Sequence, residues 1–111
     1  MPLFEFVWLP VFERSARKLL DEQDRRAIEG IICEDLRAGS VVRRTGGIRK
    51  LRYAAEGRGK RGGMRIIYLL DEPCERVYLI LAYAKGDQET LTKDEERTLR
   101  RLARALTQEP C

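Results

Sequence analysis

The sequence predicts an α+β domain in which two helices precede a small antiparallel sheet and one helix follows it. Three observations lead to this fold class. Apolar residues recur at helical spacing over residues 10–38, the period changes to two over residues 48–83, and helical spacing returns after residue 92. A chain of 111 residues suffices for one such domain and is too short for two. We therefore expect residues 1–111 to form a single domain with the element order β-α-α-β-β-β-α.

The first half of the chain predicts a strand and a helical hairpin. Residues 3–9 are aromatic and partly alternating, which is typical of a short strand. Pro10 suits the first turn of a following helix. The segment 21–24 offers N-cap residues for a second helix, which Gly39 is placed to end. We expect the two helices to cover residues 10–38 and to pack against each other.

The second half predicts three strands and a final helix. β-forming residues alternate with polar ones over residues 48–55, and a second run of β-formers covers residues 64–70. Residues 76–83 are almost continuously apolar, which is typical of a central strand covered on both faces. A short turn joins these last two strands. Thr92 and Glu95 then form a capping-box sequence at the start of the C-terminal helix.

The composition excludes several classes of site. The chain has no histidine, which removes Ser-His-Asp and Cys-His arrangements and almost every zinc-hydrolase site. Its three cysteines, Cys33, Cys74 and Cys111, lie far apart, which predicts reduced thiols in a cytoplasmic protein and no disulfide framework. No signal peptide is apparent, and the longest apolar run has eight residues, too few to span a bilayer. We expect no metal and no cofactor.

Positive charge is concentrated in one segment. The net charge is +4, yet residues 43–65 alone carry +8, because they hold nine basic side chains and one acid, Glu56. The other 88 residues hold thirteen basic and seventeen acidic side chains and sum to −4. The nine basic residues are Arg43, Arg44, Arg49, Lys50, Arg52, Arg58, Lys60, Arg61 and Arg65. Such a field favours a polyanion as the partner, with nucleic acid the first candidate and a membrane surface the second.

A glycine-rich loop, residues 56–63, lies inside this basic segment. Gly57, Gly59 and Gly62 satisfy a GxGxxG pattern, but dinucleotide binding requires a helix after the loop, and here a strand follows. The Walker A pattern also fails, because no Lys-Ser/Thr pair follows the glycines. A solvated hairpin tip is the alternative for isolated cations, but a solvated surface normally mixes both signs of charge. We therefore favour phosphate binding by this segment.

Four motifs resemble the HigB branch of the RelE-type toxins. They are the stretches at residues 45–52, 57–68, 83–85 and 91–92, which read TGGIRKLR, GRGKRGGMRIIY, YAK and LT. The resemblance covers most of the chain, in order. It implies a RelE-like fold, with a helical hairpin packed on an antiparallel sheet. It also implies a toxin of a type II toxin–antitoxin system that cleaves mRNA on the ribosome.

The resemblance further implies partners and site residues. A HigA-like antitoxin with a helix-turn-helix domain would hold the toxin inactive in a higher-order hetero-oligomer. The family's paired basic strand positions fall on Lys50 and Arg52, its strand arginine on Arg65, and its lysine after the last strand on Lys85. The family also has an arginine beside that lysine and a C-terminal tyrosine, where this chain has Gly86 and Thr92.

Metal-free RNA cleavage needs a proton taken from the 2′-hydroxyl, stabilisation of the charge on phosphorus, and a proton given to the 5′-oxygen. Without histidine the proton carriers are Lys, Tyr and Glu. Lys50 and Lys85 are our candidates, since neighbouring positive charge lowers the pKa of a lysine, and Glu56 is a weaker one. Arg52 and Arg65 would stabilise charge. Residues expected to bind RNA are Arg49, Arg58, Lys60, Arg61 and Tyr68, although core packing is the more common role of a strand tyrosine such as Tyr68.

Two other functions remain open at this point. ParE-like relatives poison DNA gyrase, and a basic module could bind RNA or the ribosome without cleaving anything. Weak acid–base groups suffice for the nuclease if the ribosome aligns the message, because orientation alone contributes roughly 7–11 kcal/mol.

Overall fold

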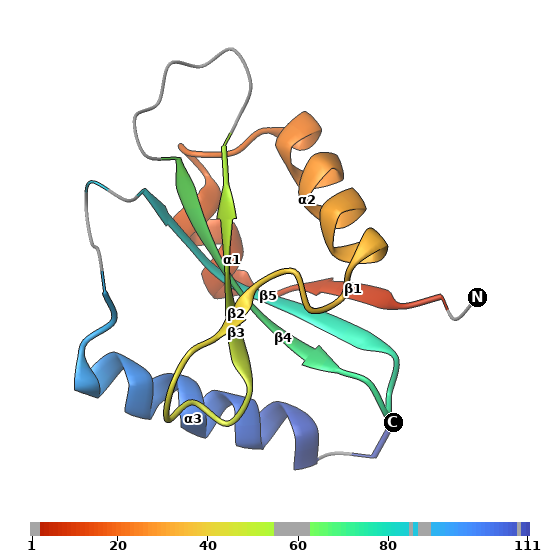
Figure 1. Ribbon diagram of the computed structural model, residues 1–111, viewed down its shortest axis with the longest axis vertical. Coiled ribbons are helices and arrows are strands. Elements are labelled where there is room, and N and C mark those ends of the chain that lie inside the picture. Colours follow the sequence, from red (N-terminus) through yellow and green to blue (C-terminus); the bar gives the residue numbers. More distant parts are fainter. Residues whose placement is uncertain (1–2, 55–62, 85, 87–89, 109) are drawn as a thin grey trace.

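Five strands and three helices follow one another in the part of the chain that the computed structural model describes, namely residues 3–54, 63–84, 86, 90–108 and 110–111 (Figure 1). The elements are β1 (Glu5–Trp8), α1 (Pro10–Ala16), α2 (Glu22–Glu34), β2 (Ser40–Val41), β3 (Ile48–Tyr53), β4 (Met64–Asp71), β5 (Arg76–Ala84) and α3 (Lys93–Gln108). This confirms the predicted α+β class and every predicted element. The two-residue strand β2 was not predicted.

The strands form one mixed sheet in the order β1-β5-β4-β3-β2. β3, β4 and β5 form the expected antiparallel meander, whereas β1 pairs with β5 in parallel. β5 therefore lies inside the sheet with a neighbour on each side, as its continuous apolar sequence predicted. The pairing register places Arg52 opposite Arg65 and Arg65 opposite Tyr83, so these three side chains lie in one row on one face of the sheet.

Helices cover both faces of this sheet and divide the core in two. α1 and α2 pack on one face, where Phe12, Ile28 and Tyr68 are fully buried. α3 packs on the other face, where Leu99 contacts a cluster that includes Ile48. Because successive strand residues point to opposite faces, β1, β3, β4 and β5 each contribute to both clusters, whereas β2 is exposed.

The helical hairpin is held by polar contacts between its two arms. Arg25 of α2 donates two hydrogen bonds to the carboxylate of Glu13 on α1, at 2.6 and 2.8 Å. Its guanidinium carbon also lies 5.2 Å from the ring centroid of Trp8. The cap predicted for the second helix is present, since Asp21 and Asp24 bond each other's backbone N–H. The pairing of α1 with α2 thus agrees with the sequence prediction.

The predicted end of the second helix was wrong. α2 ends at Glu34, and Asp35 is its C-cap residue. Gly39 has a different role: a Cβ at this position would lie 2.9 Å from the Tyr68 ring and 3.0 Å from the Lys50 carbonyl. The glycine is therefore required by close packing of the loop on the sheet.

The prediction of three reduced thiols was also wrong. Cys74 and Cys111 form a disulfide with their Cα atoms 5.3 Å apart, and Cys33 is the free, exposed cysteine. The sequence separation of 37 between the two positions concealed their proximity. α3 runs back under the sheet and brings the end of the chain beside the turn between β4 and β5 (Figure 1). Among the described helices, none has the length and apolar character needed to cross a membrane.

Candidate nucleic-acid interface

A row of three polar side chains crosses β3, β4 and β5 on the face that α3 covers. Arg52, Arg65 and Tyr83 occupy directly opposed positions on the three strands. Tyr83 belongs to the same buried cluster as α3, which fixes the face on which the row lies. Arg52 is exposed at the sheet surface, whereas Arg65 and Tyr83 keep only 7% and 8% of their surface accessible. The row thus leads from the surface into the sheet.

Lys50 lies one row away on the same face. It is half-buried on β3, between Ser40 of β2 and Ile67 of β4. The structure therefore brings together three of the four residues predicted to act in catalysis: Lys50, Arg52 and Arg65. The fourth, Lys85, lies outside the described residues.

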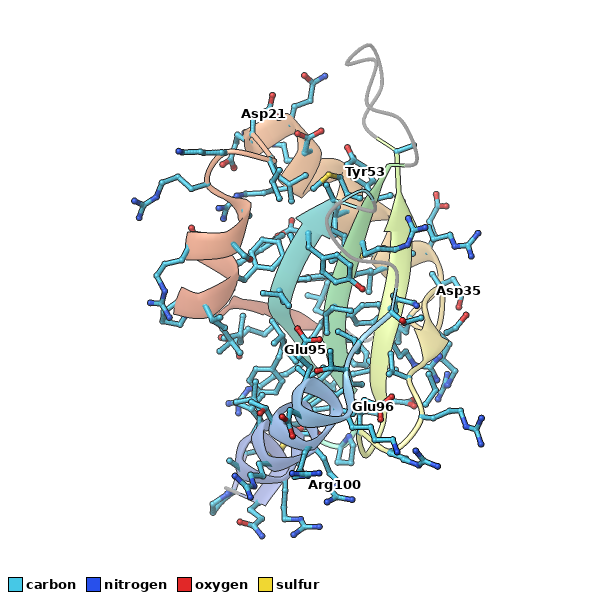
Figure 2. All side chains as sticks on the ribbon, turned by 90° about the vertical axis from the view of Figure 1, so that its left-hand side faces the viewer. Asp21, Asp35, Tyr53, Glu95, Glu96 and Arg100 are labelled. Carbon is cyan, nitrogen blue, oxygen red and sulfur yellow. A yellow bond between two sulfur atoms is a disulfide. The ribbon has the colours of Figure 1, made fainter. Side chains whose placement is uncertain are left out.

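A groove opens beside these residues, between the β2–β3 edge of the sheet and the start of α3. It encloses about 560 Å³, and its polar lining includes Arg43, Lys50, Arg52, Thr90 and Glu96. Three of these five side chains are cationic and one is acidic. Glu95 and Glu96 project from the first turns of α3, whereas Arg100 lies farther along the helix (Figure 2). The groove has the charge and the size to receive a phosphodiester segment.

Two predicted RNA-binding residues lie on the opposite face. Arg49 donates a hydrogen bond to the carbonyl of Gly39 at 2.7 Å. Tyr68 is fully buried; its hydroxyl accepts a hydrogen bond from the Gly39 N–H and donates one to the Leu36 carbonyl. Burial raises the pKa of the Tyr68 phenol. The base-stacking role suggested for Tyr68 is therefore wrong in this structure, because neither face of the ring is accessible. Arg49 instead fastens the loop to the sheet.

Seven of the eight residues of the glycine-rich loop, 56–62, lie outside the described residues. Its predicted RNA-binding residues, Arg58, Lys60 and Arg61, and the weaker proton-transfer candidate Glu56 lie outside the described residues. Their roles remain predictions.

The environment of Tyr83 was not anticipated from sequence. Its buried hydroxyl has no hydrogen-bond partner among the described residues. Burial raises the pKa of this phenol above its ordinary value; the charge of Arg65 lowers the pKa and that of Glu95 raises it. The hydroxyl therefore stays protonated at neutral pH and acts as a donor.

A second basic groove, of about 320 Å³, was also missed. It is lined by Arg44, Lys93, Glu96, Arg97 and Arg100. Arg44 comes from the basic segment, but the other basic residues come from α3, where three acids separate Lys93 from Arg97 and the local charge is mixed. Glu96 lines both grooves. Only the packing of α3 beside the loop after β2 brings these charges together.

Comparisons with known proteins give one family and one fold. A family model described as RelE toxin of RelE/RelB toxin–antitoxin system matches residues 5–109. A free-state E. coli toxin RelE with two arginines changed to alanine shares 15% identity at a TM-score of 0.59, over 86% of this chain and 96% of that chain.

Two toxin–antitoxin complexes contain a similar chain. The RelBE2 complex from Mycobacterium tuberculosis shows 21% identity and a TM-score of 0.54, over 74% of this chain and 98% of that chain. The intact E. coli RelBE complex shows 17% identity and a TM-score of 0.50, over 71% and 93%. At these identities the likeness establishes the fold, which agrees with the fold expected from the sequence motifs.

Proposed function

Because the chain belongs to the family of RelE toxins of RelE/RelB toxin–antitoxin systems, we propose that it is an endoribonuclease that cleaves translated mRNA on the ribosome. The observation that carries this proposal is the cationic row of Arg52 and Arg65 beside the groove that Lys50 lines. Two arginines at directly opposed strand positions present two guanidinium groups on one face of the sheet. A phosphodiester can accept hydrogen bonds from both of them.

The residues of this row suit cleavage by the neighbouring 2′-hydroxyl. In that reaction the 2′-oxygen bonds to phosphorus and the bond from phosphorus to the 5′-oxygen breaks. One proton leaves the 2′-hydroxyl and one is given to the 5′-oxygen, so the products are a 2′,3′-cyclic phosphate and a 5′-hydroxyl. Arg52 and Arg65 would stabilise the added charge on the phosphoryl oxygens. Lys50, which shares their face, and Lys85 are the candidates for moving the protons.

We infer that an antitoxin is the protein partner. Two of the structurally similar chains occur in complexes with antitoxins. The motifs at residues 45–52 and 57–68 favour the HigB branch and hence a HigA-like antitoxin with a helix-turn-helix domain. The same assignment makes the cytoplasm the expected compartment and the ribosome with its message the target.

The first prediction tests whether Arg65 takes part in mRNA cleavage. Inducing the wild-type protein should arrest growth and produce new mRNA ends inside translated codons. Arg65→Ala should lower the rate of cleavage on programmed ribosomes by about 10²–10³-fold, the usual effect of removing one charge-stabilising donor. Primer extension on RNA from induced cells measures the cuts, and circular dichroism checks the fold.

The matched control is Arg26→Ala, which removes the same charge from the exposed surface of α2. It should leave the cuts unchanged. Wild-type cleavage by Arg65→Ala would refute the assignment of the site. DNA damage with intact mRNA would instead indicate a ParE-like gyrase poison. Blocked translation without new RNA ends would indicate a non-catalytic RNA- or ribosome-binding module.

A further inference from the structure

The hydroxyl of Tyr83 differs from those of the other three tyrosines. Tyr53 donates a hydrogen bond to Asp24 at 2.8 Å, and Tyr68 bonds two backbone groups of the loop before β2. The Tyr78 hydroxyl interacts with Arg76 and raises the pKa of its guanidinium. All four tyrosines are buried. The Tyr83 hydroxyl alone among them has no protein partner in the described part of the chain. Core packing accounts for its ring, but not for its hydroxyl.

The position of this hydroxyl points to the substrate. Tyr83 is the direct strand neighbour of Arg65, and both side chains lie on the same face of the sheet. Directly opposed residues on neighbouring strands have adjacent side chains, so the Arg65 guanidinium and the Tyr83 phenol lie close together. Any phosphate that reaches the Arg65 guanidinium therefore comes within the neighbourhood of the Tyr83 hydroxyl.

The inner part of the row, formed by Arg65 and Tyr83, is buried in this structure. Arg65 and Tyr83 are each more than nine-tenths buried, and Glu95, in the first turn of α3, acts on the Tyr83 phenol through its charge. Glu95 also belongs to the capping box of α3: its carboxylate accepts a hydrogen bond from the Thr92 N–H at 2.8 Å. An anion can reach Arg65 only if covering side chains move, and because Tyr83 is the direct strand neighbour of Arg65, we expect the same movement to uncover Tyr83.

We infer that Tyr83 is a further substrate-contacting residue, whose hydroxyl donates a hydrogen bond to a non-bridging oxygen of the scissile phosphate bound by Arg52 and Arg65. The inference rests on the proposed ribonuclease function. The donated bond strengthens as negative charge builds on that oxygen, so its effect falls on the rate of the chemical step more than on binding. The Tyr83 hydroxyl transfers no proton, and the phenol is unchanged at the end of the reaction.

Tyr83→Phe separates this role from a structural one. The substitution keeps the ring and removes only the oxygen. Because that oxygen has no protein partner, the variant should unfold at the same urea concentration as the wild type or at a higher one. On ribosomes programmed with a defined message, kcat should fall by about 10²-fold, while KM changes by less than about threefold.

Tyr53→Phe is the matched control. It also removes a buried phenolic oxygen, but one that bonds Asp24 on the opposite face of the sheet. This variant should unfold at a lower urea concentration and keep the wild-type kcat per folded molecule. The two variants are therefore expected to show opposite patterns of stability and activity.

Each result decides a different question. If the wild type cleaves and Tyr83→Phe cleaves at the same rate, the inference is wrong and the proposed function stands. A loss of activity in Tyr83→Phe that merely follows a loss of folded protein also overturns the inference. If the wild type produces no new RNA ends, the proposed function fails, and the inference fails with it.

Discussion

At the residue scale, the opposition of Arg52 and Arg65 places like charges side by side in the sheet. Directly opposed like charges destabilise a strand pair, so we expect the Arg52 charge to lower the stability of the free protein. A bound phosphate removes that repulsion. Removing the Arg52 charge is therefore expected to raise the free energy of unfolding and to weaken the binding of RNA.

Arg52→Gln tests this expectation, because Arg52 is the exposed member of the pair. The variant should be more stable than the wild type by about 0.2–1 kcal/mol, since the cross-strand repulsion is lost. It should also bind a single-stranded RNA oligonucleotide more weakly. The plot of log affinity against log salt should become shallower by about 0.7, the value for one lost phosphate contact.

Urea unfolding and fluorescence anisotropy at several salt concentrations measure the two effects. Arg26→Gln, on the exposed surface of α2, removes a charge of the same kind and should change neither quantity appreciably. An unchanged salt slope in Arg52→Gln would mean that this side chain does not contact phosphate.

Sequence reasoning could identify the basic residues of the site, but not all of their positions. Lys50, Arg52 and Arg65 stood out because they are cations within predicted strands. Arg49 stood out for the same reason, yet it points to the opposite face and bonds Gly39. The sequence did not distinguish Tyr83 from other strand tyrosines, because its position beside Arg65 depends on the β4–β5 register. The sequence thus indicated the residue types of the site, but it did not predict the strand register that brings them together.

At the element scale, the loop between α2 and β3 determines how the basic segment meets the sheet. Gly39 lies against the Tyr68 ring and the backbone of Lys50. Gly39→Ala should therefore destabilise the protein by about 1–3 kcal/mol, because the added methyl group overpacks a close contact. Because the same contact touches Lys50, RNA affinity should fall as well.

Gly30→Ala provides the control within the adjoining helix. A Cβ at Gly30 meets nothing within 4 Å, and the residue lies in the interior of α2. This substitution should stabilise the protein by up to about 1 kcal/mol, through helix propensity alone. Thermal unfolding distinguishes the two variants, and equal melting temperatures would contradict the packing role of Gly39.

Elements with strong local signals were predicted and those that depend on tertiary contacts were not. The capping box of Thr92 and Glu95 marked the start of α3, and both of its hydrogen bonds are present. The strand β2 has two residues, too few for any period to be visible, and it forms only because β3 lies beside it. The end of α2 was misplaced because Gly39 resembled a helix terminator, while its actual role is set by Tyr68.

At the scale of the whole molecule, α3 is held to the sheet at both ends. Its first turn lies beside the candidate site, where Glu95 influences Tyr83. Its far end leads to Cys111, which is bonded to Cys74 in the turn between β4 and β5. The amphipathic pattern predicted the helix, but nothing local in the sequence identified the face of the sheet that it covers or the cysteine that it approaches.

The disulfide gives the last prediction. Closing a loop across a separation of 37 residues is expected to stabilise the folded state by roughly 3–4 kcal/mol, mainly by restricting the unfolded chain. Cys74→Ser should therefore lower the free energy of unfolding by about this amount under oxidising conditions and should have little effect in excess reductant. Urea unfolding of both proteins, with and without dithiothreitol, measures the difference.

Cys33→Ser, which changes the free, exposed cysteine of α2, should match the wild type in both conditions. Identical unfolding of Cys74→Ser and wild type without reductant would show that the bond does not stabilise the fold. If the bond does stabilise it, reducing conditions would weaken the attachment of α3 at the end far from the site.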